Sequence, residues 1–398
     1  MLNRFLYLVF IVMLAACNNA GDQNNADKPQ DSAGAATENN ELSSGKNFYK
    51  RLQGKIGNQE VVGHLSKFEG KIFFTYYYVS QGIPIGLYNY PDKKLPGDSI
   101  ELTEYDRLRK TYDMEQDNKW RVVITENAVK GKWIGGDGKT TYNISLQEHY
   151  PAGAHLFNVV GVKDSLPVTV KNDTVMATSF MMLMEPADAA VGGWYKHALL
   201  NTFSDAGSGF SGTILQYIEN ETKKYFKDYR AEIDTLLKKN VVIDGEGPYH
   251  WLNYANELNA NALYNDHHYL VMNIGSYTYT GGAHGLEGRT AVCYDMKEKK
   301  EMQLSDVISI DSVSLQKLVE KHFREQSGLK TGQLLTEILF ENKLPANDNF
   351  YFTNKGLGFI YQPYEVAAYA VGIIYVFIPY THLKPYLNPR FAQRMEIP

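Results

Sequence analysis

The sequence predicts two folded regions of different class: an N-terminal all-β antiparallel sandwich or barrel, and a C-terminal α+β domain with a mainly antiparallel sheet. Two observations carry this prediction. Between residues 47 and 150, short runs of alternating apolar and polar residues recur about every 8–12 residues, separated by Gly, Pro or Asp-Lys. Between residues 192 and 398, helical stripes of apolar residues are interspersed with strand-like runs, which is typical of an α+β domain.

The first region contains several runs of strand length, and one of them holds three successive tyrosines, Tyr76, Tyr77 and Tyr78. Successive side chains of a strand face opposite ways, so at most two of these rings share a face. Packing is therefore a better interpretation than a sugar-binding platform. The predicted strands include EVVGHLSKF (60–68), KIFFTYYYVS (71–80), SIELTEYD (99–106), WRVVITE (120–126) and TTYNISLQEH (140–149).

Residues 151–191 are interpreted as a connector with strand-like pieces. The apolar run SFMMLM, residues 179–184, fits either the last strand of the first region or the first strand of the second, and both alternatives stay open.

The second region contains two predicted amphipathic helices. Residues 213–237 carry Ile214, Ile218 and Tyr225 at helical spacing, and residues 312–325 form a second stripe that ends before Gly328. The predicted strands are 268–278, 289–296, a hairpin that turns across Asn354-Lys355-Gly356, and 372–380.

The N-terminus resembles a bacterial lipoprotein signal. Arg4 precedes an apolar run of about ten residues, too short to cross a bilayer, and Leu14-Ala15-Ala16-Cys17 resembles a lipobox. We therefore expect residues 1–16 to be a signal peptide, Cys17 to carry lipid, and residues 17–46 to form a flexible tether. The expected location is the cell envelope, with the lipid in a membrane. The outer membrane is favoured because Asn18 follows the cysteine.

Composition and charge exclude several partners. The chain has 40 basic and 45 acidic residues, a net charge of −5, and no dense basic run, so no nucleic-acid partner is expected. Gly207, Gly209 and Gly212 satisfy G-x-G-x-x-G, but no apolar strand precedes them, so no nucleotide partner is expected either. With Cys17 assigned to lipid, Cys293 alone cannot form a disulfide framework or a cysteine-based zinc site.

No catalytic residue, metal site or cofactor is predicted. Asp266, His267 and His268 look like metal ligands, with His284 as a fourth. Consecutive histidines on a strand point to opposite faces, however, so at most one could share a site with His284. The stretch TFSDAG (202–207) differs from the metal-binding TFDDG of polysaccharide deacetylases, because Ser204 stands at the first aspartate position. G-x-S-x-G and H-E-x-x-H are absent.

Two longer motifs carry a family resemblance. YTYTGGAHG (277–285) is followed by CYDMKEKKEMQLSDVI (293–308), and NFYFTNKGLGFIYQPYEVAAYAVGIIYVFIPY spans residues 349–380. Over about residues 264–387, the chain resembles the extracytoplasmic domain of lysozyme-sensing anti-sigma factors of the RsiV type, a module that also precedes the catalytic part of some peptidoglycan deacetylases. The resemblance implies that residues 192–398 form an α+β binding module. It also implies a lysozyme-type muramidase or peptidoglycan as the ligand.

The histidine of the first motif is interpreted as structural. Gly281 and Gly282 allow the chain to turn sharply after a strand, and His284 then braces that turn. A ligand-contacting role is the alternative, and its candidate residues are Tyr279, His284, Tyr364, Glu365 and Tyr369.

These observations favour a lipid-anchored envelope protein with a non-enzymatic ligand-binding or sensing module. The cytosolic segment that an anti-sigma factor needs and the deacetylase catalytic domain are both missing from the sequence. One alternative is an envelope glycan-processing enzyme whose acidic site the sequence does not locate. Another is that the β-rich region is the functional part and the C-terminal module is a scaffold.

Overall fold

The computed structural model describes residues 46–89, 95, 98–105, 117–203, 209–239 and 249–398. The predicted signal peptide, Cys17 and the tether up to residue 45 lie outside the described residues, and so do Ser204 and Gly207. Within the described ranges, no helix combines the length and the apolar character that crossing a membrane requires.

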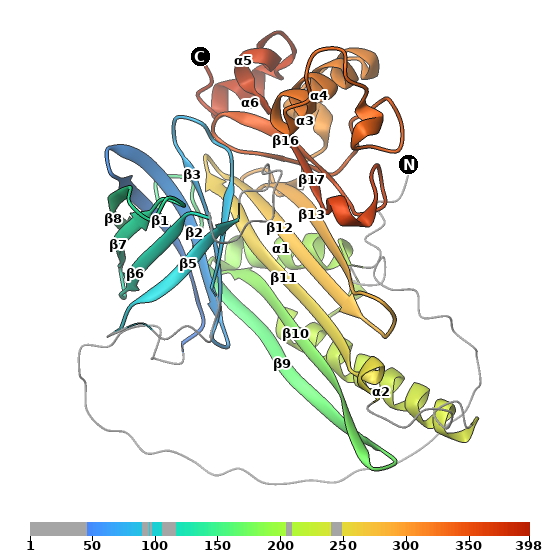
Figure 1. Cartoon of the computed structure of the whole chain (residues 1–398). Coiled ribbons are helices and arrows are strands. Elements are labelled where there is room, and N and C mark those ends of the chain that lie inside the picture. Colours follow the sequence, from blue (N-terminus) through green and yellow to red (C-terminus); the bar gives the residue numbers. More distant parts are fainter. Residues whose placement is uncertain (1–45, 90–94, 96–97, 106–116, 204–208, 240–248) are drawn as a thin grey trace.

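Strands β1 to β8 form a closed antiparallel barrel in which each strand pairs with the next and β8 pairs with β1 (Figure 1). Closure leaves no unpaired sheet edge, so the barrel satisfies its backbone hydrogen bonds internally. Of the two predicted architectures for the first region, the barrel is the one that forms. Its strands are β1 (Phe48–Ile56), β2 (Gln59–Phe68), β3 (Lys71–Tyr78), β4 (Ile85–Asn89), β5 (Ile100–Tyr105), β6 (Lys119–Ile124), β7 (Ala128–Ile134) and β8 (Thr141–Glu148).

The carboxyl group of Glu104 organises the polar part of the barrel core. Its Oε1 accepts hydrogen bonds from the Tyr76 hydroxyl (2.6 Å), Trp120 Nε1 (2.9 Å) and Trp133 Nε1 (2.7 Å), and its Oε2 accepts one from Asn118 Nδ2 (2.8 Å). Buried donors need an acceptor inside the protein. Glu104 therefore supplies, from one position, the acceptor that three aromatic side chains share.

A second sheet has six strands in the order β14-β13-β12-β11-β10-β9, and its neighbours are antiparallel except for the parallel pair β10–β11. The run 179–184, which the sequence could not assign, lies in β10 of this sheet. The strands are β9 (Phe157–Val170), β10 (Asp173–Pro186), β11 (Tyr254–Asp266), β12 (Tyr269–Tyr279), β13 (Leu286–Asp295) and β14 (Lys300–Glu301).

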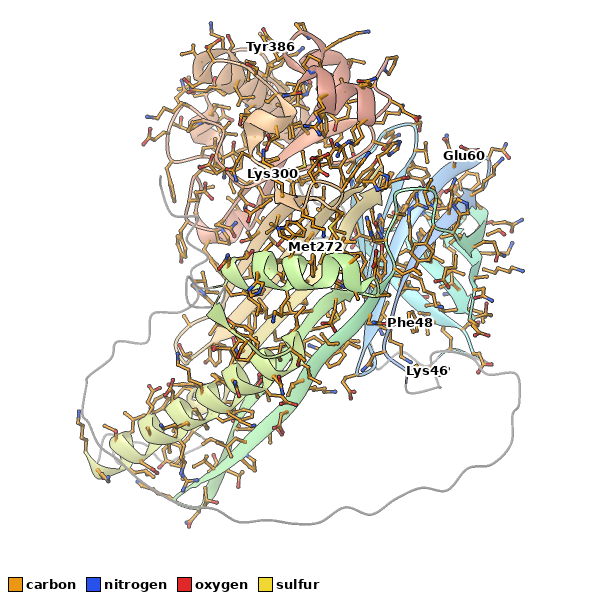
Figure 2. The ribbon with its side chains drawn as sticks, turned by 180° about the vertical axis from the view of Figure 1, so that it is seen from behind. Lys46, Phe48, Glu60, Met272, Lys300 and Tyr386 are labelled. Carbon is orange, nitrogen blue, oxygen red and sulfur yellow. The ribbon has the colours of Figure 1, made fainter. Side chains whose placement is uncertain are left out.

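The portions of β11 to β13 nearest the β11–β12 turn are buried on both faces. Leu270, Met272 and Ile274 of β12 pack in one apolar cluster with residues of α1 (Ala189–Asn201) and α2 (Ile214–Lys238), and Figure 2 shows Met272 beside α1. Tyr269 and Val271 point to the other face and pack with the C-terminal segment. Because successive side chains of a strand point to opposite faces, alternate residues of β12 contribute to two separate hydrophobic cores.

The C-terminal segment combines a three-stranded sheet, in the order β15-β16-β17, with short helices that lie over the end of the larger sheet (Figure 1). Its strands β15 and β16 lie beside β13. The elements are α3 (Leu304–Val307), α4 (Ser312–Ser327), η4 (Leu335–Glu337), β15 (Phe350–Phe352), β16 (Gly356–Tyr361), η5 (Tyr369–Val371), β17 (Ile374–Pro379), α5 (Tyr380–Leu383), η6 (Lys384–Tyr386) and α6 (Pro389–Arg394).

The predicted α+β class of the second region is confirmed. The predicted helices 213–237 and 312–325 correspond to α2 and α4, and Gly328 ends α4 in the left-handed conformation with φ 63°. A side-chain hydroxyl at Thr213 caps the start of α2 together with Gln216. The predicted hairpin across Asn354-Lys355-Gly356 joins β15 to β16.

A buried arginine fastens the barrel to the six-stranded sheet. Arg51 of β1 is 2% exposed, and its guanidinium donates to the Asp266 carboxylate (2.9 Å), to the Asn265 carbonyl oxygen (3.0 Å) and to the His149 carbonyl oxygen (2.8 Å). A buried charge is tolerated when it is paired and its remaining donors are satisfied. This arrangement fixes one side of the barrel against the β11–β12 turn.

His64 of β2 lies in the same junction. Its Nδ1 is 2.9 Å from the Tyr49 hydroxyl, which also accepts from Asn265 Nδ2 (3.1 Å), while its Nε2 has no hydrogen-bond partner among the described residues. Burial, and secondly the charge of Arg51, hold the pKa of His64 well below 6.5. The folded protein therefore keeps this imidazole neutral.

We expect His64 to make stability depend on pH. The unfolded chain takes up a proton below about pH 6.5 and the folded chain does not, so the free energy of unfolding should fall below that pH by up to about 1.4 kcal/mol per pH unit. Urea unfolding between about pH 7.5 and about pH 5.5 measures the slope. His64→Gln should flatten it, and the matched control His250→Gln, at an exposed position on η3 (His250–Leu252), should leave it unchanged. Equal slopes for wild type and His64→Gln would contradict the assignment.

Glu104 should contribute strongly to the stability of the barrel. Glu104→Ala leaves the Tyr76, Trp120 and Trp133 donors without an acceptor and should cost roughly 3–5 kcal/mol. Glu104→Gln keeps an oxygen for these donors and loses only the bond from Asn118, about 1 kcal/mol. Urea unfolding followed by tryptophan fluorescence tests the difference, and equal losses for the two variants would show that hydrogen bonding to this carboxyl group is unimportant.

Candidate functional site

The loop between β12 and β13 turns through two glycines with positive φ. Gly281 has φ 91° and Gly282 has φ 93°, values that L-residues with a side chain rarely adopt. A Cβ on Gly281 would lie 2.9 Å from the carbonyl oxygen of Trp251, and a Cβ on Gly285 would lie 2.5 Å from the Tyr277 ring. Glycine is therefore required for both backbone conformation and close packing, as the sequence predicts for a sharp turn.

His284 follows this turn and stacks on a ring from the C-terminal segment. The ring centroids of His284 and Tyr369 are 3.9 Å apart and the ring planes differ by 17°. The imidazole is exposed, its Nδ1 is 2.9 Å from the Gly285 carbonyl oxygen, and its Nε2 is 3.4 Å from the Tyr364 hydroxyl. Tyr364 and Tyr369 also contact each other, with centroids 5.5 Å apart. His284 thus braces the turn and also lies open to solvent.

The segment that carries Tyr364 and Tyr369 is held by hydrogen bonds from its side chains to the backbone of Gly285 and Arg289. The side-chain amide of Gln362 accepts a hydrogen bond from the Arg289 backbone nitrogen (2.9 Å) and donates one to the Arg289 carbonyl oxygen (2.5 Å). It thus makes the pair of hydrogen bonds that a neighbouring strand would make with Arg289. The Tyr369 hydroxyl donates to the Gly285 carbonyl oxygen (2.7 Å). These bonds place both rings beside the glycine turn.

Partial burial, and then the negative charge of Glu287, raise the pKa of the Tyr369 hydroxyl above its usual value of 10.0. The hydroxyl therefore stays protonated at neutral pH. Its proton is needed for the bond to Gly285.

Two of the predicted site residues brace turns. Glu365 Oε1 accepts from Asn347 Nδ2 (2.9 Å) and its Oε2 accepts from the Gln362 backbone nitrogen (2.7 Å), so both carboxylate oxygens stabilise the turn that presents Tyr364. The Tyr279 hydroxyl donates to the Gly282 carbonyl oxygen (3.1 Å). His284 therefore bonds to Gly285 and Tyr364, whereas Glu365 bonds to Asn347 and Gln362.

Two further aromatic residues extend this group. Trp251 is 42% exposed and lies against Gly281, and Tyr277 is 39% exposed and lies against Gly285. Tyr364 is 55% exposed. We use the term aromatic surface for this set: Trp251, Tyr277, Tyr279, His284, Tyr364 and Tyr369.

Sequence reasoning missed two members of the aromatic surface. Tyr277 could have been found, because it alternates with Tyr279 and so shares its side of β12. Trp251 could not have been found from the sequence. It precedes β11, and it contacts Gly281 only because β11 pairs with β12.

The histidine pair considered as metal ligands does not lie on a strand. His267 and His268 form the two-residue turn between β11 and β12, with φ 53° and 62°. The eleven-residue β12 separates this turn from the loop of His284, a span of roughly 36 Å. Within the part of the chain that the structure describes, no three His, Cys, Asp or Glu side chains are placed to hold a metal ion. Cys293 is buried, and its thiol donates to the Phe350 carbonyl oxygen.

Comparisons with known proteins place part of this site in a known family. Residues 305–381, which include Tyr364, Glu365 and Tyr369, match the family described as "Protein of unknown function (DUF3298)". The comparison with curated proteins found no match.

Two solved structures of this family resemble the chain. A DUF3298 family member from Bacteroides fragilis has a TM-score of 0.54 and 20% sequence identity, with 62% of this chain and 99% of that chain covered. A DUF3298 family protein from Pseudomonas aeruginosa has a TM-score of 0.39 and 15% identity, with 59% of this chain and 96% of that chain covered. The chain thus carries a DUF3298 domain near its C-terminus, within a fold that the Bacteroides fragilis protein shares.

Proposed function

We propose that this protein is a lipid-anchored component of the cell envelope, and that its C-terminal module binds a ligand through the aromatic surface without chemical turnover. The ligand class follows from the resemblance to lysozyme-sensing domains: a lysozyme-type muramidase or a fragment of peptidoglycan. The lipid is carried by Cys17, and the outer membrane is the favoured location.

The observation that carries the binding proposal is the exposed stack of His284 on Tyr369, with Tyr364 against it. Exposed aromatic rings are uncommon on inert surfaces and are enriched where proteins bind partners. His284 and Tyr369 are also both hydrogen-bonded to the Gly285 carbonyl oxygen, and such preorganisation lowers the entropy lost on binding. A preformed, solvent-open aromatic surface therefore supports recognition.

The arrangement gives less support to an enzyme. General acid–base catalysis needs a titratable group that can reach a substrate proton. Both oxygens of Glu365 are already used by Asn347 and Gln362, and His284 bonds to Gly285 and Tyr364. No observation at this site favours glycan processing over binding.

Tyr369→Ala should weaken ligand binding at least about tenfold, because it removes the ring under His284 and the bond to Gly285. Biolayer interferometry with the immobilised mature chain, offered lysozyme and soluble peptidoglycan fragments separately, measures the effect and distinguishes the two ligands. Tyr369→Phe keeps the ring and should retain most of the binding.

Tyr142→Ala, at a 50% exposed tyrosine of the barrel, is the matched control and should bind as wild type does. Circular dichroism confirms that each variant is folded. A wild-type chain that binds neither ligand would refute the ligand assignment. Undiminished binding by Tyr369→Ala would instead refute the aromatic surface as the site.

The lipid anchor has its own test. Cells that express the full chain should incorporate labelled palmitate into it, and Cys17→Ser should abolish the label and release the protein from membranes washed at roughly 1 M salt, where surface-charge attraction is screened. Retention of unlabelled Cys17→Ser protein after that wash would show that lipid is not the anchor.

A further inference from the structure

The two sides of the barrel have different surroundings. The outward side chains of β1 to β3 face the six-stranded sheet: Arg51, His64 and Tyr77 are all buried in the junction. Strands β6 to β8 lie on the opposite side, away from the sheet (Figure 1). Most of their outward side chains are exposed among the described residues, so this part of the barrel can meet a partner.

The outward side of β6 and β7 is basic. Arg121, Lys130 and Lys132 are exposed, and Lys119 is half-buried. We call these four residues the basic face. The neighbouring strand β8 adds exposed but uncharged side chains: Thr141, Asn143, Ser145 and Gln147.

The pairing of the strands concentrates this charge. Arg121 lies directly opposite Lys132 in the β6–β7 register, and like charges in such a pair destabilise a sheet. Arg121 pairs with the carboxylate of Glu101 of β5 at 2.9 Å, and Lys132 donates to the amide oxygen of Asn143 at 3.4 Å. A chain whose net charge is −5 thus carries a cluster of cations on a side of the barrel where they are exposed among the described residues.

The chain enters the fold through the barrel. Lys46 and Phe48 lie at one end of it and Glu60 at the other (Figure 2). Phe48 begins β1, which pairs with β8, the strand next to the basic face. A lipid on Cys17 would therefore bring the barrel close to a membrane before any other described part of the chain.

We propose that the basic face docks the barrel on a membrane surface that carries anionic lipid headgroups. In the cell, the lipid anchor proposed above would bring the barrel to the membrane. The electrostatic attraction between the basic face and anionic headgroups does not depend on that anchor. Each Lys or Arg near an anionic surface adds a modest, salt-dependent attraction. The face is a strand surface without a described groove-forming element over it, which suits an extended lipid surface better than a single polymer strand.

Docking in this way would set the orientation of the aromatic surface. The β11–β12 turn lies at the barrel junction, where Asp266 binds Arg51, and the loop of His284 lies at the other end of β12. With the barrel on the membrane, the aromatic surface would stay away from the lipid and open to ligand.

The test uses the mature chain with Cys17→Ser, which has no lipid, and two kinds of vesicle: phosphatidylcholine alone, and phosphatidylcholine mixed with phosphatidylglycerol. Cosedimentation should show binding to the mixed vesicles only, and the binding should disappear at roughly 1 M salt, where the Debye length falls to about 3 Å. Lys130→Thr/Lys132→Thr should lower the partition coefficient roughly tenfold or more. Threonine suits an exposed strand position, so the barrel should keep its fold.

The matched control is Lys223→Gln/Lys227→Gln, which removes two exposed cations from α2 and should bind as the parent chain does. Equal binding to both kinds of vesicle, absent binding, or an undiminished partition coefficient for the strand variant would each overturn the proposal. Capture of soluble polyphosphate without vesicle binding would overturn it as well. Vesicle binding that persists while palmitate labelling fails would uphold the basic face and remove only the lipid anchor.

Discussion

Burial of β11, β12 and β13 on both faces near the β11–β12 turn is the constraint on which the rest of the structure depends. Side chains of one parity pack with α1 and α2, and those of the other parity pack with the C-terminal segment. A slip of one residue in register would exchange the two sets and place each in the wrong core. The register is therefore strongly specified, and so are the positions of the turns at the ends of these strands.

Two regions built from different parts of the chain lie at opposite ends of β12. At one end, the His267-His268 turn meets Arg51 of the barrel through Asp266. At the other end, the glycine turn carries His284 to Tyr369. The strand ends at the barrel junction are buried, whereas those at the glycine turn are largely exposed or half-buried.

In the aromatic surface, the same residues stabilise the turn and are accessible to solvent. His284 and Tyr369 both bond to Gly285, so the rings that brace the turn are also the rings that solvent reaches. The two interpretations of His284 that the sequence left open, a structural brace and a ligand contact, are therefore compatible. Glu365 has a different part, since its carboxylate supports the turn below Tyr364.

The sequence by itself determined the elements whose signals are local. Periodicity predicted the barrel strands β2, β3, β5, β6 and β8 and the helices α2 and α4, whereas β1, β4 and β7 were not predicted. A glycine marked the end of α4, and a pair of glycines marked the turn before His284. Only the tertiary structure decided which elements meet. β10 pairs in parallel with β11 across about seventy intervening residues, and β11 itself escaped prediction because asparagines interrupt its apolar pattern. The stack of His284 on Tyr369 has the same origin, because local pattern encodes the period of an element while long-range packing selects its neighbours.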